Sequence, residues 1–230
     1  MNYIFVHHRI ETAPRCWQAV ASRIVQEGTP RIAAIGGAIY GIWRSQIGRP
    51  RDELQVLTVW SDVMRAAHAE RALLGRDPAD VKAKYSESLL PTLRPTDPAP
   101  PMRQGNYAFR WFATPARDWP EFLDLCAEAW PGFEAAYDSQ VIGLWQAMGD
   151  RTSTVADDAT GAGIQEGVRT LLLTRRPNLA MWERSKLPEG AAESQVRETL
   201  SRRYDLCDWT VVSTATLLTA VDRQDTARWT

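Results

Sequence analysis

The chain of 230 residues has 44% hydrophobic and 24% charged side chains and a formal net charge of −1, values typical of a globular protein with a substantial core. A charge balance this close to zero excludes bulk attraction to nucleic acid or to an anionic membrane. The sequence has no apolar run of about 18 residues, and its first residues lack the pattern of a signal peptide, so we expect a cytoplasmic protein without a membrane span.

The first part of the chain predicts the order strand, helix, strand, strand, helix, strand. Residues 3–10 form an aromatic and β-branched run typical of a strand. An amphipathic helix follows, predicted by apolar residues at i, i+3, i+4 and i+7, namely Trp17, Val20, Ala21 and Ile24. Next we expect strands at 39–46 and 54–60, a helix at 62–74, a helical segment near 78–86 and a strand at 87–95.

The second part predicts the same order after the Pro-rich stretch 96–105. It begins with a strand at 107–113 and a helix whose stripe is Trp119, Phe122, Leu123 and Cys126. The remaining elements are strands at 141–148 and 168–174, helices at 178–186 and 191–204, and a strand at 209–221.

One phrase occurs in both parts of the chain. "IYGIWRSQ" (39–46) and "VIGLWQAM" (141–148) place Gly41 against Gly143 and Trp43 against Trp145, and 143 − 41 = 102 is the offset of both pairs. This repetition predicts an α+β fold of two tandem ferredoxin-like β-α-β-β-α-β repeats, since one such sheet needs a second to cover its open face. We therefore expect an intrachain pseudo-dimeric α/β barrel.

The repeat also predicts the domain organisation. Residues 1–95 form the first repeat, 96–105 a Pro-rich linker, and 106–230 the second repeat. The second repeat contains an additional loop, 149–167, rich in Gly, Ala, Thr and Asp. A loop of this composition is either a tolerated insertion, which we favour, or a functional lid.

Four segments resemble a known family. The run "YIFVHHRI", the strand "GIWRSQIG", the strand end "LTVWSD" and the segment "ESLLPTLRP" look like the NIPSNAP-type branch of the dimeric α/β-barrel superfamily. The resemblance covers most of the chain as two tandem copies, although "LLLTRRP" (171–177) has no tryptophan where Trp60 stands. It implies a barrel that holds a small, apolar or aromatic molecule, in a superfamily of monooxygenases, haem-handling enzymes, lyases and isomerases.

Two residues, Arg110 and His8, are candidates for catalysis. If Phe5 and Phe109 pack under the helices, strand alternation turns His8, Arg110 and Phe112 into the barrel. A barrel arginine either binds an anion or forms a structural ion pair at the mouth, and an inward histidine is either a general base or a hydrogen-bonded core residue.

The candidate ligand-binding residues are largely aromatic. They are Tyr40, Trp43, Arg44, Trp60, Phe112 and Trp145. Tryptophans in such strands either stack on an aromatic ligand or fill the core, and core packing is the more frequent outcome.

No sequence motif identifies a cofactor or a metal. The three cysteines are far apart, and dinucleotide, P-loop, zinc-protease and serine-hydrolase motifs are missing, so we expect neither a cofactor nor a metal.

The leading hypothesis for the function is a small-molecule-binding barrel, acting as a cofactor-independent oxygenase or isomerase, and the alternative is a non-catalytic binding or interaction protein. A haem enzyme similar to chlorite dismutases is a third reading; that group takes its axial histidine from the second unit, whereas His7, His8 and His68 all lie in the first. The chain would be a monomeric pseudo-dimer or a homodimer.

Overall fold

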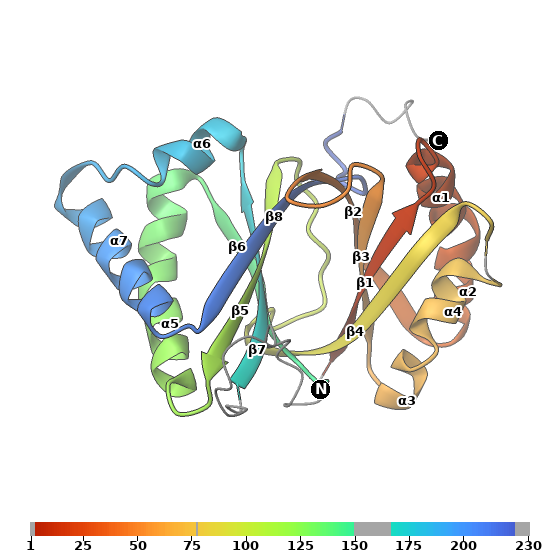
Figure 1. Ribbon diagram of the computed structural model, residues 1–230, viewed down its shortest axis with the longest axis horizontal. Helices are drawn as coiled ribbons and strands as arrows, with labels where there is room; N and C mark the ends of the chain where they lie inside the picture. The colour runs from red at the N-terminus through yellow and green to blue at the C-terminus, as the bar shows by residue number, and fades with distance from the viewer. Residues whose placement is uncertain (1–2, 77, 150–166, 224–230) are drawn as a thin grey trace, which may run out of the picture.

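The computed structural model describes residues 3–76, 78–149 and 167–223, to which the structural statements below refer (Figure 1). The first half contains β1 (Ile4–Thr12), α1 (Trp17–Arg23), the π-helical turn η1 (Ile24–Gly28), α2 (Thr29–Ala34), β2 (Gly37–Ile47), β3 (Glu53–Trp60), α3 (Val63–Ala66), α4 (Ala69–Leu74) and β4 (Val81–Arg94). The second half contains β5 (Asn106–Pro115), α5 (Trp119–Tyr137), β6 (Gln140–Ala147), β7 (Gly167–Arg176), α6 (Leu179–Arg184), α7 (Gly190–Asp205) and β8 (Trp209–Leu217). The predicted loop 149–167 lies almost entirely outside the described residues.

The strands form one closed antiparallel barrel in the order β1-β3-β2-β8-β5-β7-β6-β4. Each half contributes four neighbouring strands in the ferredoxin-like arrangement. The edges of the two sheets are joined by the ladders β2–β8 and β4–β6, so that no sheet edge is left open. This confirms the predicted α+β barrel and adds that the halves meet edge to edge through backbone hydrogen bonds.

One predicted element is wrong. The segment near 78–86 was expected to be helical, but from Val81 onward it belongs to the long strand β4, which pairs with β1 on one side and, from Leu89, with β6 on the other. Val81, Ala83 and Tyr85 alternate with Lys82 and Lys84, a period of two that is typical of a strand.

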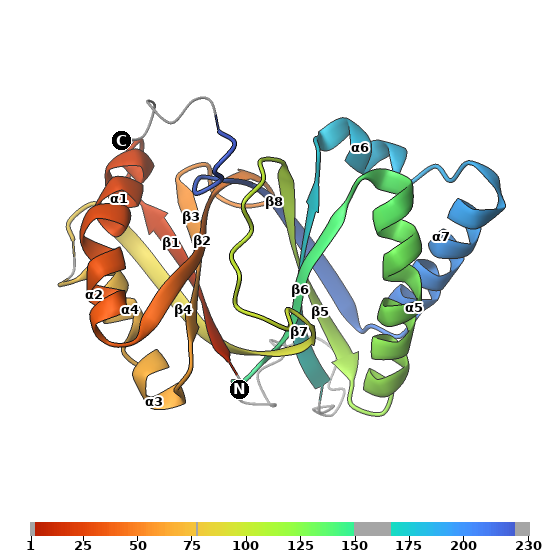
Figure 2. The same cartoon turned by 180° about the vertical axis from the view of Figure 1, so that it is seen from behind.

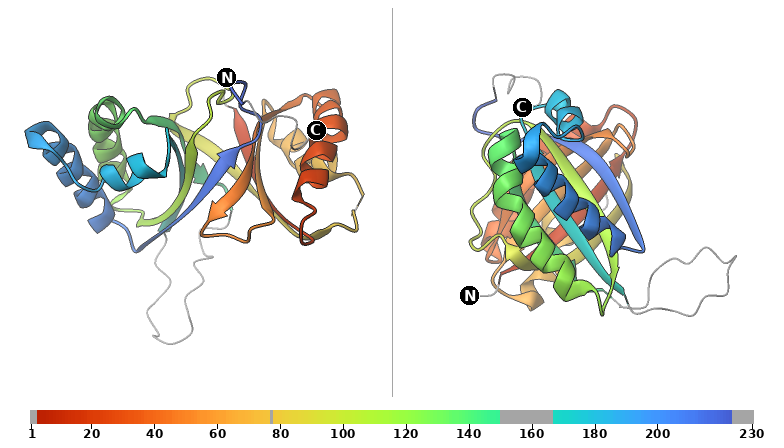
Figure 3. Two further views of the ribbon diagram at one scale, coloured as in Figure 1. Left: turned by 90° about the horizontal axis from the view of Figure 1, so that it is seen from above. Right: turned by 90° about the vertical axis from the view of Figure 1, so that its left-hand side faces the viewer.

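Helices cover the outer faces of the barrel in two separate layers (Figures 1 and 3). In the first half, Val20 and Ile24 of the α1–η1 segment pack with Ile10 and Val56 of the sheet. In the second half, α5 and α7 pack together over β5, β6 and β7 around Phe112. Among the helices of the described ranges, none combines the length and the hydropathy that crossing a bilayer requires.

Aromatic side chains fill one end of the barrel interior. We call this group the inner aromatic cluster: Phe5, Tyr40, Trp43, Tyr107, Phe109 and Trp145. Its rings contact one another mostly edge-on, with Trp43 and Phe109 centroids 5.3 Å apart. The linker after β4 lies at the same end, where Pro95 and Pro100 line a shallow pocket with Tyr40 (Figure 2).

The repeated phrase is a packing motif of this interior. A Cβ atom on Gly41 would lie 2.3 Å from Cη2 of Trp43, and one on Gly143 would lie 2.3 Å from Cη2 of Trp145. The ladder of each phrase also shifts register just before the glycine, between Ile39 and Gly41 and between Val141 and Gly143. Each glycine therefore makes room for an indole ring that folds back over it inside the barrel.

The Gly41→Ala and Gly143→Ala substitutions should each destabilise the protein by about 1–3 kcal/mol, because the added methyl group overlaps a fully buried indole. Urea unfolding followed by tryptophan fluorescence measures this loss. Gly149→Ala is the matched control, since a Cβ there would meet only Glu87 at 3.9 Å and should leave stability unchanged. Equal midpoints for all three variants would contradict the packing role of the two glycines.

Candidate functional site

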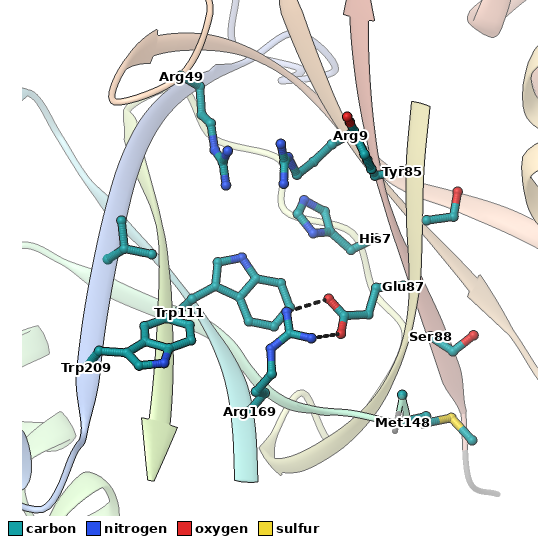
Figure 4. Close-up of a pocket in the computed structure, with 13 residues that line it drawn as sticks. His7, Arg9, Arg49, Tyr85, Glu87, Ser88, Trp111, Met148, Arg169 and Trp209 are labelled. Carbon is teal, nitrogen blue, oxygen red and sulfur yellow. Dashed lines mark hydrogen bonds and ion pairs between the residues drawn. The ribbon is translucent and has the colours of Figure 1, made fainter. Parts of the chain in front are cut away.

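The other end of the barrel holds a cavity of about 640 Å³ (Figure 4). Along β1 the inward side chains change from Phe5, in the inner aromatic cluster, to His7 and Arg9, which line the cavity. The full lining is His7, Arg9, Arg49, Tyr85, Ser86, Glu87, Ser88, Trp111, Met148, Gly149, Arg169, Trp209 and Val211.

The same change from apolar to polar side chains occurs on other strands. On β7 the inward residues are Leu173, Leu171 and then Arg169, and on β4 they change from Leu89 to Glu87. The alternation of inward and outward side chains thus continues along each strand, while the inward side chains change from apolar to charged. The barrel is packed at one end and hollow at the other.

Arginines and carboxylates form two ion-pair groups in the cavity. Arg169 Nη1 and Nη2 donate to the two oxygens of Glu87 at 2.8 and 3.2 Å, the dashed lines of Figure 4. Glu53 lies behind the lining, with its Oε2 3.6 Å from Nη2 of Arg9 and its Oε1 3.9 Å from Nε of Arg49. Three guanidinium groups thus face two carboxylates, which leaves an excess of one positive charge for a bound anion to balance.

Several buried polar atoms at the cavity lining or directly behind it are without a hydrogen bond. Among the described residues, Nε of Arg9, Oε1 of Glu53 and Nε2 of Gln55 have no hydrogen-bond partner. A buried polar group left unpaired costs about 1–3 kcal/mol. Of these three residues Arg9 lines the cavity, so its guanidinium group is available to a polar ligand there.

His7 is the histidine that faces this cavity. Its ring stacks on Phe109 with centroids 5.5 Å apart, and its Nε2 lies 3.1 Å from Oε1 of Gln55. Burial lowers the pKa of His7 to about 3, although the hydrogen bond to Gln55 opposes this shift. The imidazole is therefore neutral near pH 7 and can orient a ligand through hydrogen bonding.

Aromatic side chains complete the walls. The guanidinium of Arg169 lies 5.2 Å from the ring centre of Trp111, and that of Arg9 lies 5.1 Å from the ring centre of Tyr85. Trp209 lies beside Trp111 (Figure 4), and its side chain is partly exposed. A flat ligand can stack on these rings while the arginines neutralise its charge.

The predicted inward orientation of His8, Arg110 and Phe112 is wrong. Inward positions are odd-numbered along β1 and β5, because the inner aromatic cluster contains Phe5 and Phe109. His8 instead bonds Ser86 and Thr58 on the helix side, at 2.8 and 3.2 Å.

Arg110 and Phe112 of β5 lie under the helices of the second half, beside Tyr204 of α7. A strand shifted by one residue exchanges all its inward and outward side chains, so a wrong choice of face affects every residue of the strand.

The other candidate residues are also placed by strand face. Tyr40, Trp43 and Trp145 face inward but belong to the inner aromatic cluster, away from the cavity. Arg44 lies outside, over the ring of Trp17 at 4.4 Å, and Trp60 packs in the helix-side core of the first half.

The residues that line the cavity were missed by the sequence analysis. A sequence signal existed for them: Phe5, His7 and Arg9 share one face, as do Leu171 and Arg169, and each set becomes polar toward the same end of the barrel. Assigning the odd-numbered residues of these strands to the interior would have revealed this change from apolar to polar side chains.

No group of three or more His, Cys, Asp or Glu side chains able to hold a metal ion occurs within the described ranges. The histidines also do not fit a haem held by an imidazole. His7 is 2% exposed and engaged with Gln55 and Phe109, His8 is buried on the helix side, and His68 is exposed at the start of α4.

Comparison of the whole chain with known proteins supports the fold. No protein-family model matches the sequence. No curated protein matches it. Solved structures of similar fold include an anthrone oxidase-like protein (12% identity, 94% of this chain and 91% of that chain, TM-score 0.57). A proposed monooxygenase from Fusobacterium nucleatum subsp. nucleatum is also similar (6% identity, 94% and 92% coverage, TM-score 0.56).

A third similar structure is a variant of chlorite dismutase from Candidatus Nitrospira defluvii (8% identity, 94% and 90% coverage, TM-score 0.55). The chain therefore has the dimeric α/β-barrel fold, here built from the two halves of one polypeptide. Identities this low show a shared fold and leave the activity open.

Stability should fall as the pH decreases from about 6.5 toward 3. Burial lowers the pKa of His7 and of His8 to about 3, so the unfolded chain binds up to two more protons than the folded one in this range. Two protons correspond to a slope of about 2.7 kcal/mol per pH unit. Urea unfolding at pH 7, 6 and 5 measures the slope.

The combined substitutions His7→Gln and His8→Gln should reduce this slope toward that of the remaining groups. His68→Gln, at an exposed position, is the control and should leave the slope as in the native protein. An unchanged slope in the doubly substituted protein would show that the two buried imidazoles do not govern this range.

Proposed function

We propose that this protein binds a flat, weakly acidic aromatic molecule as its anion inside the barrel. The observation that carries the proposal is the cavity of about 640 Å³, where Arg9, Arg49 and Arg169 meet the aromatic walls formed by Trp111 and Trp209. Cavities of about 300–1,000 Å³ with apolar walls and a few polar groups are typical ligand sites. The excess positive charge favours an ionised phenol or enol over its neutral form.

More specifically, we propose that the protein is a cofactor-independent oxygenase. Glu87 is the candidate base, since burial raises the pKa of its carboxyl group even with Arg169 beside it. Proton transfer from the substrate to Glu87 would leave an electron-rich carbanion or enolate, which the arginines stabilise away from water. Dioxygen would then oxidise a CH₂ group between aromatic rings to a carbonyl, with water as the second product.

The solved structures of similar fold support the oxygenase proposal, because two of them are a proposed monooxygenase and an anthrone oxidase-like protein. An affiliation with NIPSNAP-type proteins, based on the strand phrases around Trp43 and Trp60, is part of the same proposal. The opposing alternative is a non-catalytic binding protein, which the tightly packed inner aromatic cluster favours, since it fills one end of the interior.

The binding proposal predicts that 2-naphthol binds at least about tenfold more tightly than 2-methoxynaphthalene, which cannot ionise. Arg49→Gln should remove most of this preference, because it removes the excess positive charge. Isothermal titration calorimetry measures both affinities, and Arg117→Gln, at an exposed arginine, is the control. Equal affinities for the two compounds, or no binding of either, would contradict the proposal.

The catalytic form predicts that anthrone and dissolved oxygen react faster with the protein than in buffer. Oxygen uptake and anthraquinone absorbance should rise together, and Glu87→Gln should lower the rate by about 10²-fold. Glu70→Gln, a carboxylate on the helix side, is the matched control. A rate equal to that in buffer, with 2-naphthol still bound, would refute the oxygenase and support the non-catalytic alternative.

A further inference from the structure

A second cleft lies on the opposite side of β5, between the outer face of the second sheet and the helices α5, α6 and α7. It has a volume of about 340 Å³ and continues into a small inner pocket of about 50 Å³. Arg110 and Arg176 line both parts, and Arg203 lines the inner one. Arg110 and Trp111 are adjacent in sequence, so the strand separates this cleft from the barrel cavity.

The three arginines have no carboxylate partner within the described part of the chain. Their side-chain hydrogen bonds go to uncharged acceptors: Arg110 donates to Thr210 at 3.4 Å, Arg176 to Thr174 at 3.2 Å, and Arg203 to the sulfur of Cys126 at 3.7 Å.

Several other arginines of this protein form ion pairs, although Arg44 and Arg175 contact only uncharged groups. Arg23, Arg94 and Arg169 are all partly buried, and each forms an ion pair with a carboxylate at 2.7–2.8 Å. Arg203 is buried, and Arg110 and Arg176 are half-buried. Cations withdrawn from water without a partner of opposite charge are costly, so their concentration in one cleft points to a group that balances them.

Ring stacking accounts for the faces of the guanidinium groups but not for their edges. Arg176 lies 4.4 Å from the ring centre of Trp182 and 4.9 Å from that of Phe133, and Arg203 lies 4.8 Å from that of Tyr204. Stacking leaves the N–H edges free, and Nε of Arg176 and Nε of Arg203 are both buried without a hydrogen-bond partner.

Electrostatics indicates the same kind of partner. Burial lowers the pKa of Arg110, and it lowers the pKa of Arg176 to about 10; Tyr204 opposes both shifts, and repulsion from Arg110 adds to that of Arg176. Burial also acts to lower the pKa of Arg203, but Cys126 and Tyr204 outweigh it and the pKa is raised.

Lys186, at the rim of the cleft, is neutralised by Glu183 at 2.8 Å, whereas no carboxylate among the described residues pairs with the inner arginines. An oxyanion between them would offset both the repulsion and the desolvation.

We propose that this cleft binds a small molecule with an oxyanion group, a carboxylate or a phosphate, on an aromatic body. The oxyanion accepts hydrogen bonds from Arg110 and Arg176, with the charge of Arg203 behind them, because guanidinium forks match carboxylate and phosphate oxygens. The aromatic body lies against Trp182 and Leu200, which line the cleft. This site is independent of the barrel cavity and of the function proposed for it.

The test uses 1-naphthoate and 1-naphthyl phosphate as probes and 1-naphthalenemethanol as the uncharged control, at constant ionic strength. In the native protein, at least one of the two anions should bind, and phenylglyoxal labelling mapped by mass spectrometry should show Arg110 and Arg176 protected. Arg117, which is exposed, should be labelled equally with and without the probe. The more strongly protecting anion identifies the preferred oxyanion.

Arg176→Gln should weaken that protection of Arg110 and the associated affinity at least about tenfold. Without ligand the variant should unfold at the same temperature as the native protein or higher, since a half-buried charge without a carboxylate partner is gone. Arg49→Gln, in the barrel cavity, should leave the protection of Arg110 intact, which separates this site from the other.

The proposal is overturned if neither anion protects Arg110 and Arg176 in the native protein. It is also overturned if Arg176→Gln retains native affinity, or if 1-naphthalenemethanol protects as well as the anions do. Because the protection experiment uses the native protein, it decides the matter even if a variant does not fold.

Discussion

The hydrogen-bonded ladders that join β2 to β8 and β4 to β6 are the interactions on which the rest of the structure depends. They unite two four-stranded sheets into a closed barrel without free edges. Closure gives the strands one shared interior and two outer faces, which the helices cover. Every side chain on a strand then has one of two environments, and its position in the alternation decides which one it enters.

The shared interior is divided by residue type along the barrel axis. At one end the inner aromatic cluster is packed so tightly that Gly41 and Gly143 are needed to admit the tryptophan rings. At the other end arginines and carboxylates line a cavity, since charged groups keep contact with water or with a ligand. The packed end can hold the cavity walls in place, as a rigid scaffold does for a binding site.

The two faces of β5 show how one strand can serve two sites. Trp111 faces the barrel cavity, and its neighbour Arg110 faces the cleft under α5 and α7. Arginine is the common element of both sites, but its pairing differs. In the cavity Arg169 is held by Glu87, whereas Arg110 and Arg176 have only neutral hydrogen-bond partners among the described residues.

The sequence alone determined the order of the elements, because stripes such as Val20–Ile24 and the repeated Gly-x-Trp phrase depend on local spacing and on side-chain type. It failed for residues 78–86, which were expected to be helical: from Val81 onward they form a strand, because this run pairs with β1. Only the tertiary structure decided which face of each strand turns inward: His8 and Arg110 were expected inside, and His7 and Trp111 occupy that place. Alternation gives two equivalent solutions for a strand that is buried on both faces, and only packing against the helices and the opposite sheet distinguishes them.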